Sequence, residues 1–195
     1  MSGPNKAASW SAPAQLEAPT KGSPSRCPVM NTAIVGGPGD NGGNNAGTGA
    51  AWVFVQPALQ VLPATNIAAS GIQGQQFSPA SFQYQLSSTS GNLNYQITGI
   101  PPWLIANFTS GTATTSPVTV TFSLQNLGSL PPNTYTATIT FTNTSTGNGN
   151  TTRTATLTVS PGTKGGCVGG GWQNYISFPG PFQNQGQCVS YFANQ

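Results

Sequence analysis

Apolar and polar residues alternate one by one along several short segments of the chain. The clearest segment is 135–142, in which Tyr135, Ala137, Ile139 and Phe141 alternate with threonine. Successive side chains of a β-strand point to opposite faces of a sheet, so this pattern predicts a strand with one face in a core and the other in water. No helical period competes with the alternation.

The same alternation recurs between clusters of Gly, Pro, Asn and Ser from about residue 60 to about residue 160. Other segments alternate at 82–86, 95–97, 118–124 and 153–159, and apolar residues also gather around Ile67 and at 103–108. These make about seven strands in about a hundred residues, which is the size of an immunoglobulin-like sandwich. The sequence therefore predicts an all-β fold, an antiparallel immunoglobulin-like sandwich over residues 59–161.

The segments on either side of the sandwich differ in composition. Residues 1–30 hold repeated prolines and few large apolar residues, which predicts a disordered arm. Residues 31–58 hold two apolar runs around a Gly-rich turn, which predicts a β-hairpin with a long connection. Residues 162–195 enclose a Gly- and aromatic-rich segment between Cys167 and Cys188, which predicts a disulfide-closed C-terminal loop with little regular structure.

Charged side chains are scarce enough to exclude much chemistry. They make up only 4% of the 195 residues, against roughly a quarter in an ordinary globular protein. There is no His, and the two carboxylates, Glu17 and Asp40, lie in the N-terminal part. General acid–base catalysis needs groups that titrate near neutral pH, and Ser/His/Asp or Cys/His arrangements need His. The composition therefore argues against an enzyme, and we expect no cofactor and no metal site.

The sequence also argues against nucleic-acid binding and against insertion in a membrane. The five Lys and Arg residues form no cluster of the kind that neutralises several phosphates, which argues against nucleic-acid binding. No apolar run approaches the ~18 residues of a transmembrane helix, and no apolar signal-peptide segment follows Met1. We therefore expect no nucleic-acid partner and no transmembrane segment.

The hairpin region resembles part of a known bacterial repeat. Residues 31–55, with Gly-Gly-Pro-Gly-Asp-Asn-Gly-Gly at 36–43, resemble part of one FG-GAP-type repeat of bacterial surface β-propellers. A propeller needs several blades to close, so this chain alone does not make one. Of the acids in the calcium loop of that family only Asp40 is present, so the resemblance carries over no metal site.

Residues 61–159 resemble bacterial immunoglobulin-like modules of the BACON type. The matching features are Pro102-Trp103-Leu104, the Ser-Gly-Thr turn at 110–112, and segments 117–122 and 135–143. The resemblance implies an extracellular module that is associated with carbohydrate binding and adhesion.

The tail resembles a C-terminal motif of secreted bacterial proteins, in which Cys and Gly-Gly-Trp precede Phe-Lys-Asn-Gln-Gly-Asp-Cys-Val-Ser. Here Cys167-Val-Gly-Gly-Gly-Trp172 precedes Phe182-Gln-Asn-Gln-Gly-Gln-Cys-Val-Ser190, with Gln183 and Gln187 in place of the Lys and Asp. Together the three resemblances imply the C-terminal part of a larger surface protein, whose signal peptide and further blades would precede Met1.

Cys167 and Cys188 are candidates for a disulfide or for a metal or redox pair. Metal sites need more ligands than two thiols, and His is absent, so we favour the disulfide. A closed loop of about 20 residues would add roughly 3 kcal/mol of stability in the chain-entropy model, and a disulfide predicts an exported protein. Cys27 is left over and is expected to be a free thiol, unless it lies close to one of the other two.

Exposed aromatic rings are the candidates for ligand binding. Most rings of the sandwich fall on inward positions, and Trp103 is favoured as a core residue over a sugar-stacking platform, which leaves Phe108 at a strand end. The tail supplies four more candidate rings: Trp172, Tyr175, Phe178 and Phe182. These four either dock on the sandwich or form an exposed apolar patch.

Threonines occupy the outward positions of the predicted strands. An ordinary solvated strand surface explains them, and the alternative is a flat hydroxyl face that binds an ordered surface such as ice or a crystalline polysaccharide. The residues are Thr119, Thr121, Thr136, Thr138, Thr140, Thr154, Thr156 and Thr158.

Taken together, these patterns predict a non-catalytic extracellular module of a bacterial surface or secreted protein. Its expected partner is an extracellular polysaccharide or a surface protein. The alternative is a structural spacer that has no ligand of its own, and binding to glycans or matrix proteins would discriminate between the two.

Overall fold

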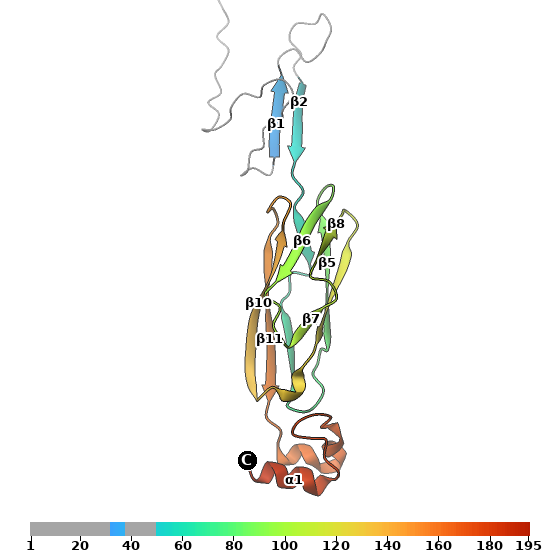
Figure 1. Cartoon of the computed structure of the whole chain (residues 1–195), viewed down its shortest axis with the longest axis vertical. Helices are drawn as coiled ribbons and strands as arrows, with labels where there is room; N and C mark the ends of the chain where they lie inside the picture. Colours follow the sequence, from blue (N-terminus) through green and yellow to red (C-terminus); the bar gives the residue numbers. More distant parts are fainter. Residues whose placement is uncertain (1–31, 38–49) are drawn as a thin grey trace, which may run out of the picture. The chain divides into compact units, whose positions relative to one another are not determined.

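The computed structural model of the chain describes residues 32–37 and 50–195 (Figure 1). The chain divides into two units, residues 1–55 and residues 56–195. In the first unit, β1 (Thr32–Gly37) pairs antiparallel with β2 (Ala50–Val55). The arm predicted to be disordered, the long connection of the hairpin and Cys27 all lie outside the described residues.

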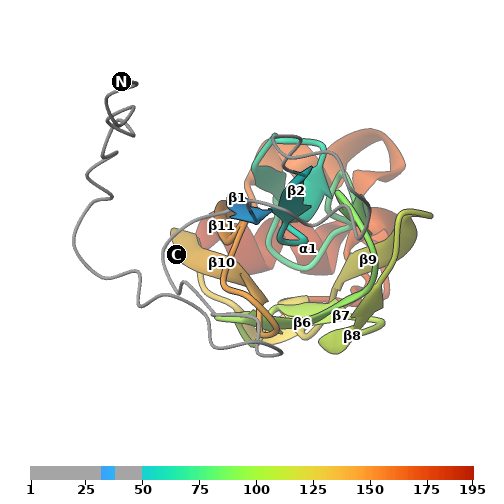
Figure 2. The same ribbon diagram turned by 90° about the horizontal axis from the view of Figure 1, so that it is seen from above.

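The second unit contains a sandwich of two β-sheets that share one apolar core (Figures 1 and 2). One sheet has the strand order β3-β5-β9-β7 and the other β4-β11-β10-β6-β8, and only the β4–β11 pair is parallel. This arrangement confirms the predicted all-β, immunoglobulin-like sandwich. The strands are β3 (Leu59–Leu62), β4 (Ile67–Ile72), β5 (Ser81–Ser88), β6 (Leu93–Thr98), β7 (Leu104–Ala106), β8 (Ser110–Ala113), β9 (Val118–Leu124), β10 (Asn133–Asn143) and β11 (Thr151–Ser160).

Within residues 56–195 the two sheets hold five and four strands, where the sequence predicts about seven in total. One difference is β8, because the resemblance predicts a turn at 110–112 and the structure has an edge strand there. The Ser-Gly-Thr segment has no large apolar side chain to reveal a strand. It is held instead by backbone pairing with β6, in a register that runs from Leu93 opposite Ala113 to Gln96 opposite Ser110.

Alternate residues of the strands fill the core, as the pattern predicts. Ile139 and Leu157 are 0% exposed, and the rings of Tyr84, Phe122 and Phe141 pack with centroids between 5.7 and 6.2 Å apart. Such tilted and edge-on contacts are favourable for aromatic pairs. The strands that carry large apolar residues at every second position are therefore the ones that hold the two sheets together.

Three other aromatic residues of the sandwich test the prediction of inward rings. Trp103 is 5% exposed and belongs to the core, which is the favoured alternative. Phe82 and Tyr135 are predicted to point inward but are only partly buried. Phe82 is the second residue of β5 and Tyr135 the third residue of β10, so both rings lie near the start of a strand.

Arg153 is a buried charge that the sequence pattern does not reveal as such. Its guanidinium donates hydrogen bonds from Nη2 to the carbonyl of Val61 at 2.8 Å and from Nε and Nη2 to that of Pro63 at 3.2 and 3.1 Å. The guanidinium carbon also lies 5.8 Å from the centroid of the Tyr84 ring. Arg153 thus ties β11 to the connection between β3 and β4.

The tail differs from the loop that the sequence predicts, because it contains helices. A 3-10 helix (Lys164–Asn174), interrupted by non-helical backbone at Val168, Gly169 and Gly170, is followed by α1 (Gln185–Ala193). Asn184 caps α1, since its side chain accepts a hydrogen bond from the backbone N–H of Gln187 at 2.9 Å. Side-chain caps of this kind stabilise short helices that have weak intrinsic propensity.

The tail is attached to one end of the sandwich (Figure 1). The carbonyl of Gly74, in the turn after β4, accepts hydrogen bonds from the backbone N–H groups of Ile176 at 2.7 Å and Ser177 at 3.1 Å. Ile72 of β4 also packs against the apolar core of the tail. These contacts connect the tail to the β4–β5 turn.

Candidate functional site

The four candidate rings of the tail have different environments. Tyr175 and Phe182 are 1% and 7% exposed, and their rings pack at a centroid distance of 5.4 Å in a small core that also contains the two cysteines. Both predicted rings are therefore covered by other residues of the tail in this structure. Trp172 is partly buried against the same core, and Phe178 is 56% exposed.

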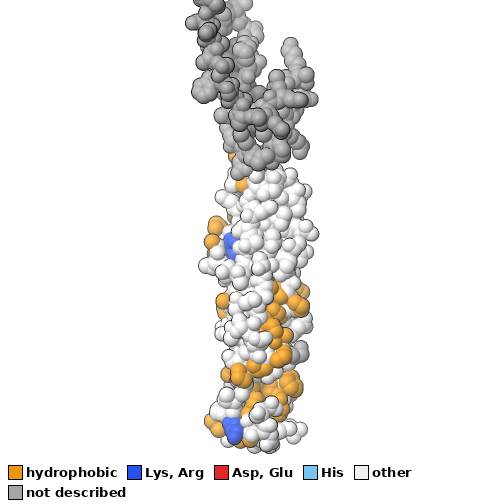
Figure 3. Space-filling model, turned by 90° about the vertical axis from the view of Figure 1, so that its left-hand side faces the viewer, with side chains coloured by type: hydrophobic (Ala, Val, Ile, Leu, Met, Phe, Trp, Pro, Cys, Tyr) orange, Lys and Arg blue, Asp and Glu red, His pale blue; other side chains and the backbone are white. Residues whose placement is uncertain are grey.

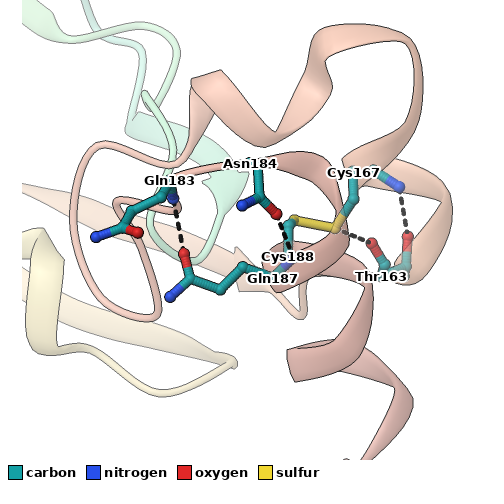
Figure 4. The surroundings of a disulfide bond; sticks show 7 residues. Thr163, Cys167, Gln183, Asn184, Gln187 and Cys188 are labelled. Atoms are coloured by element: carbon teal, nitrogen blue, oxygen red, sulfur yellow. Dashed lines mark hydrogen bonds between the residues drawn. A yellow bond between two sulfur atoms is a disulfide. The ribbon is translucent and has the colours of Figure 1, made fainter.

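The disulfide between Cys167 and Cys188 is present. The two Cα atoms are 5.8 Å apart, within the usual range of about 4.4–6.8 Å, and both side chains are 0% exposed. Figure 4 shows the bond between the start of the 3-10 helix and the start of α1, beside the capping residue Asn184. In the same figure the side chain of Gln187 accepts a hydrogen bond from the backbone N–H of Gln183 at 2.7 Å. Gln183 and Gln187, which replace the Lys and Asp of the secreted-protein motif, are thus joined by a hydrogen bond between uncharged groups.

A shallow groove of about 390 Å³ lies on the outer side of β6 and β8, at the edge of the five-stranded sheet. We call it the β6–β8 groove. Its exposed lining consists of amides, hydroxyls and backbone from Asn94, Gln96, Ser110, Gly111, Thr112 and Thr144. The sequence does not reveal this groove, because the Ser-Gly-Thr segment lacks the alternating apolar pattern of a strand that pairs with β6. The two outward amides of the Leu-Asn-Tyr-Gln-Ile segment, Asn94 and Gln96, are the sequence feature that points to a polar surface here.

Hydrogen bonds fix one half of the groove and leave the other half open. The hydroxyl of Thr112 donates to the side-chain carbonyl of Asn94 at 2.9 Å, and the hydroxyl of Thr144 donates to the backbone carbonyl of Asn94 at 3.1 Å. Among the described residues, no partner within hydrogen-bond distance is found for the side chains of Gln96 and Ser110. These two exposed groups are available to a ligand.

Gly111 lets the edge strand lie close against the ring of Tyr95. A Cβ at Gly111 would lie 3.0 Å from the Tyr95 hydroxyl oxygen and 3.2 Å from the ring, which is tighter than most real contacts. Tyr95 is 3% exposed, and burial raises the pKa of its hydroxyl from the ordinary value of 10.0. The ring beneath the groove is therefore neutral at physiological pH.

Phe108 is an exposed ring at the end of the same edge. It is 53% exposed, as the sequence analysis expects of a strand-end candidate. The backbone N–H of Ile97 donates to the carbonyl of Thr109 at 2.7 Å, which continues the β6–β8 ladder beyond the pair of Gln96 and Ser110. Phe108 directly precedes Thr109 and therefore lies just beyond the end of this ladder.

The outward threonines do not form a single face. Thr119 and Thr121 belong to β9 in the four-stranded sheet, whereas the other six predicted residues belong to β10 and β11. On β10 and β11 the threonines lie directly opposite one another. The pairs are Thr134 with Thr158, Thr136 with Thr156, Thr138 with Thr154 and Thr140 with Thr152.

Charge is nearly absent from the part of the chain that the structure describes. Its charged side chains are Arg153, which is buried, and Lys164, which is exposed in the tail. On the side shown in Figure 3, uncharged polar groups cover much of the sandwich and apolar side chains gather toward the tail. Among the described residues, no group of three or more His, Cys, Asp or Glu side chains could hold a metal ion. None of the helices within residues 50–195 is long and apolar enough to cross a membrane.

Comparison with known proteins finds similarity only among solved structures. No family model matches the sequence, and no curated protein sequence matches it. The periplasmic chaperone SfaE is 9% identical with a TM-score of 0.37, over 53% of this chain and 58% of that chain. WR4, a member of the MSP family of C. elegans, is 9% identical with a TM-score of 0.32, over 52% of this chain and 97% of that chain.

A GH5 xyloglucanase of Bacteroides ovatus is 13% identical with a TM-score of 0.33, over 54% of this chain and 19% of that chain. The matched part therefore spans less than two thirds of the chaperone and about a fifth of the xyloglucanase. At identities of 9–13% and TM-scores of 0.32–0.37, none of these similarities assigns a function to this chain.

Proposed function

We propose that the chain is a non-catalytic extracellular module of a bacterial surface or secreted protein, and that it binds a polysaccharide or another surface protein. The observation that carries this proposal is the uncharged polar surface of the sandwich. Arg153 is buried among backbone carbonyls, so the exposed side chains of the two sheets offer hydroxyls and amides rather than charges.

Such a surface suits some partners better than others. Hydroxyl and amide groups both donate and accept hydrogen bonds, which matches the hydroxyl-rich surface of a polysaccharide. Nucleic-acid binding would require several cations that neutralise phosphates, and hydrolysis would require an acid and a base held close together. The groups present in residues 56–195 therefore support binding rather than catalysis.

The extracellular location is supported by the disulfide. Structural disulfides persist in oxidising environments and are rare in reducing cytosol. The bond between Cys167 and Cys188 is fully buried and joins the two helical segments of the tail, so the fold of the tail depends on it. Secretion would supply the oxidising conditions that this bond needs.

A structural spacer is the second candidate function. The directly opposed threonines of β10 and β11 favour it, because cross-strand Thr–Thr pairs stabilise a sheet by themselves. A threonine-rich surface can therefore arise without a ligand.

One experiment distinguishes these functions. The oxidised protein is screened on a glycan array, on insoluble polysaccharides and on immobilised matrix proteins, and the same polysaccharides are assayed for released reducing ends. We expect binding without release of sugar. Binding to none of these surfaces would favour the spacer, and released reducing ends would contradict a non-catalytic module.

A further inference from the structure

We infer that the β6–β8 groove, together with Phe108, is a binding subsite for a neutral polysaccharide chain. This inference rests on the proposed function and assigns it to a place on the sandwich. The groove lies on the exposed edge of the five-stranded sheet, about 390 Å³ in volume, and nothing among the described residues covers it.

The polar groups of the groove match the hydroxyls of a sugar. Each sugar hydroxyl can donate one hydrogen bond and accept others, and amide or hydroxyl side chains offer both functions. Gln96 and Ser110 are exposed side by side as a register pair, and neither side chain is occupied by another described residue. Asn94 is held in place by Thr112, which keeps its amide nitrogen free to donate.

Phe108 supplies the apolar contact that sugar recognition also requires. Binding sites usually combine an apolar or aromatic surface with a few well-placed polar groups. The C–H-rich face of a pyranose ring packs against an aromatic ring. Phe108 is 53% exposed and directly precedes Thr109, whose carbonyl accepts a hydrogen bond from Ile97 of β6. Phe108 is thus two residues before Ser110, the register partner of Gln96, and its ring extends the polar groove by an apolar surface.

The absence of charge in the groove selects a neutral ligand. Its lining residues carry no cationic or anionic side chain, and the hydroxyl of Tyr95, whose pKa is raised by burial of the side chain, stays protonated at physiological pH. A uronic-acid or sulfated polymer would have to leave water without gaining a cation in exchange, which is unfavourable. Neutral sugars lose only hydrogen bonds with water, which Gln96, Ser110 and Asn94 replace.

The surface beyond the groove favours a polysaccharide over a single sugar as the ligand. Gln96 lies opposite Thr142, and Thr98 lies opposite Thr140, which in turn lies opposite Thr152. Rows of uncharged side chains thus continue from the groove across β10 to β11, at the inter-strand spacing of about 4.8 Å. A polysaccharide that crosses the strands would contact hydroxyls at each step.

The test uses two groove variants, each with a matched control. Phe108→Ala is paired with Ile105→Ala, whose side chain is 50% exposed on β7 of the four-stranded sheet. Gln96→Ala is paired with Gln85→Ala, an exposed glutamine on the four-stranded sheet. All four side chains are exposed, so thermal unfolding is expected to be unchanged, and it is measured to confirm that each variant folds.

Binding is measured by depletion from suspensions of cellulose, chitin and insoluble xylan, with polygalacturonate gels as the acidic comparison. We expect the wild-type chain to bind at least one neutral polymer and to bind polygalacturonate more weakly. Phe108→Ala should weaken binding by about tenfold and Gln96→Ala by severalfold, because truncating a central contact residue has effects of this size. Both controls should bind like the wild type.

The possible failures are distinguishable. Polysaccharide binding that both groove variants retain would overturn the inference and leave the proposed function standing. Binding to a matrix protein but to no polysaccharide would have the same consequence. Stronger binding to polygalacturonate than to every neutral polymer would contradict the inference that the ligand is uncharged. Binding to none of the tested surfaces would overturn the inference and the proposed function together.

Discussion

At the scale of single residues, Arg153 is the side chain with the clearest predicted effect. It is 7% exposed, and its donors meet the carbonyls of Val61, Pro63 and Thr152 together with the Thr151 hydroxyl. Replacing it with Met keeps much of the volume but removes these donors. We expect Arg153→Met to lower the free energy of unfolding by about 3 kcal/mol, because the buried carbonyls lose a charged partner. Urea denaturation measures this change.

Arg153→Lys is the informative comparison, because it keeps the charge. A lysine ammonium cannot reproduce the planar fork that reaches the Pro63 and Val61 carbonyls at once, so we expect an intermediate loss of stability. A Lys variant as stable as the wild type would show that the charge alone matters. A Met variant as stable as the wild type would contradict the bridging role of the side chain.

Tyr84 and Tyr95 are buried, and we expect them to lower the stability of the fold at alkaline pH. Burial raises the pKa of Tyr84 from 10.0, opposed by a smaller effect of Arg153 that lowers it, and burial also raises the pKa of Tyr95. The unfolded chain therefore loses these protons first. Stability is complete below about pH 10 and falls as the pH rises through and above that value.

The pH dependence is measured by urea denaturation from about pH 8 to about pH 11.5, which brackets the ordinary tyrosine pKa. The double variant Tyr84→Phe/Tyr95→Phe should show a smaller loss of stability over this range. Tyr84→Phe also removes the hydrogen bond that the protonated hydroxyl donates to the carbonyl of Thr65, which lowers stability already below about pH 10. The change of stability with pH, and not the absolute stability, is therefore compared. Equal slopes in the variant and the wild type would contradict the assignment.

At the scale of elements, the loop between β10 and β11 packs on the beginning of β3. The backbone N–H of Leu59 donates a hydrogen bond to the carbonyl of Asn148 at 2.9 Å. The buried side-chain amide of Asn143 donates to the backbone carbonyls of Pro57 at 3.2 Å and Asn148 at 3.0 Å. Gly149 has φ of +79°, and a Cβ there would collide with the carbonyl oxygen of Leu59. Gly147, with φ of +76°, has open space around it.

This difference makes Gly147 a control for Gly149. Gly147→Ala should cost about 1 kcal/mol of stability, because alanine is strained at positive φ. Gly149→Ala should cost roughly 2 kcal/mol more, because the collision forces the loop away from β3 and breaks its hydrogen bonds. Thermal and urea unfolding of the two variants give the comparison, and equal losses would contradict the proposed docking of the loop.

The elements also show what the sequence can and cannot reveal. Strands such as β9 and β10 are predictable because large apolar residues alternate along them. β8 is not, since Ser-Gly-Thr is held by the backbone of β6 and not by burial of its own side chains. The helices of the tail are hidden by their glycines, although Asn184 and Gln187 form a visible capping pattern.

The sequence reveals some residues of the candidate site and not others. Phe108 is predictable from the sequence, because it falls outside the inward positions that accommodate the other rings of the sandwich. Gln96 and Ser110 become a pair only through the register of β6 and β8, which no local pattern encodes. The sequence leaves open whether Tyr175 and Phe182 are buried, because their packing depends on helices that the glycines conceal.

At the scale of the whole molecule, the sandwich and the tail have separate apolar cores. The larger core lies between the two sheets, and the smaller one contains the disulfide together with Tyr175 and Phe182. The turn after β4 connects them, since Gly74 accepts two backbone hydrogen bonds there and Ile72 packs on the tail. Because the two cores are separate, we expect the tail to lose structure without the sandwich.

Removing the disulfide should separate the stability of the two parts. We expect Cys167→Ser/Cys188→Ser to lose about 3 kcal/mol of stability in the tail alone, as the chain-entropy model gives for a loop of this length. Hydrogen exchange should accelerate throughout residues 164–193 while β9 and β10 stay protected. Because the β6–β8 groove lies on the sandwich, this variant should still bind any polysaccharide that the wild type binds. Loss of protection in β9 and β10 would show that the tail and the sandwich fold as one cooperative unit, and loss of binding would move the site from the groove to the tail.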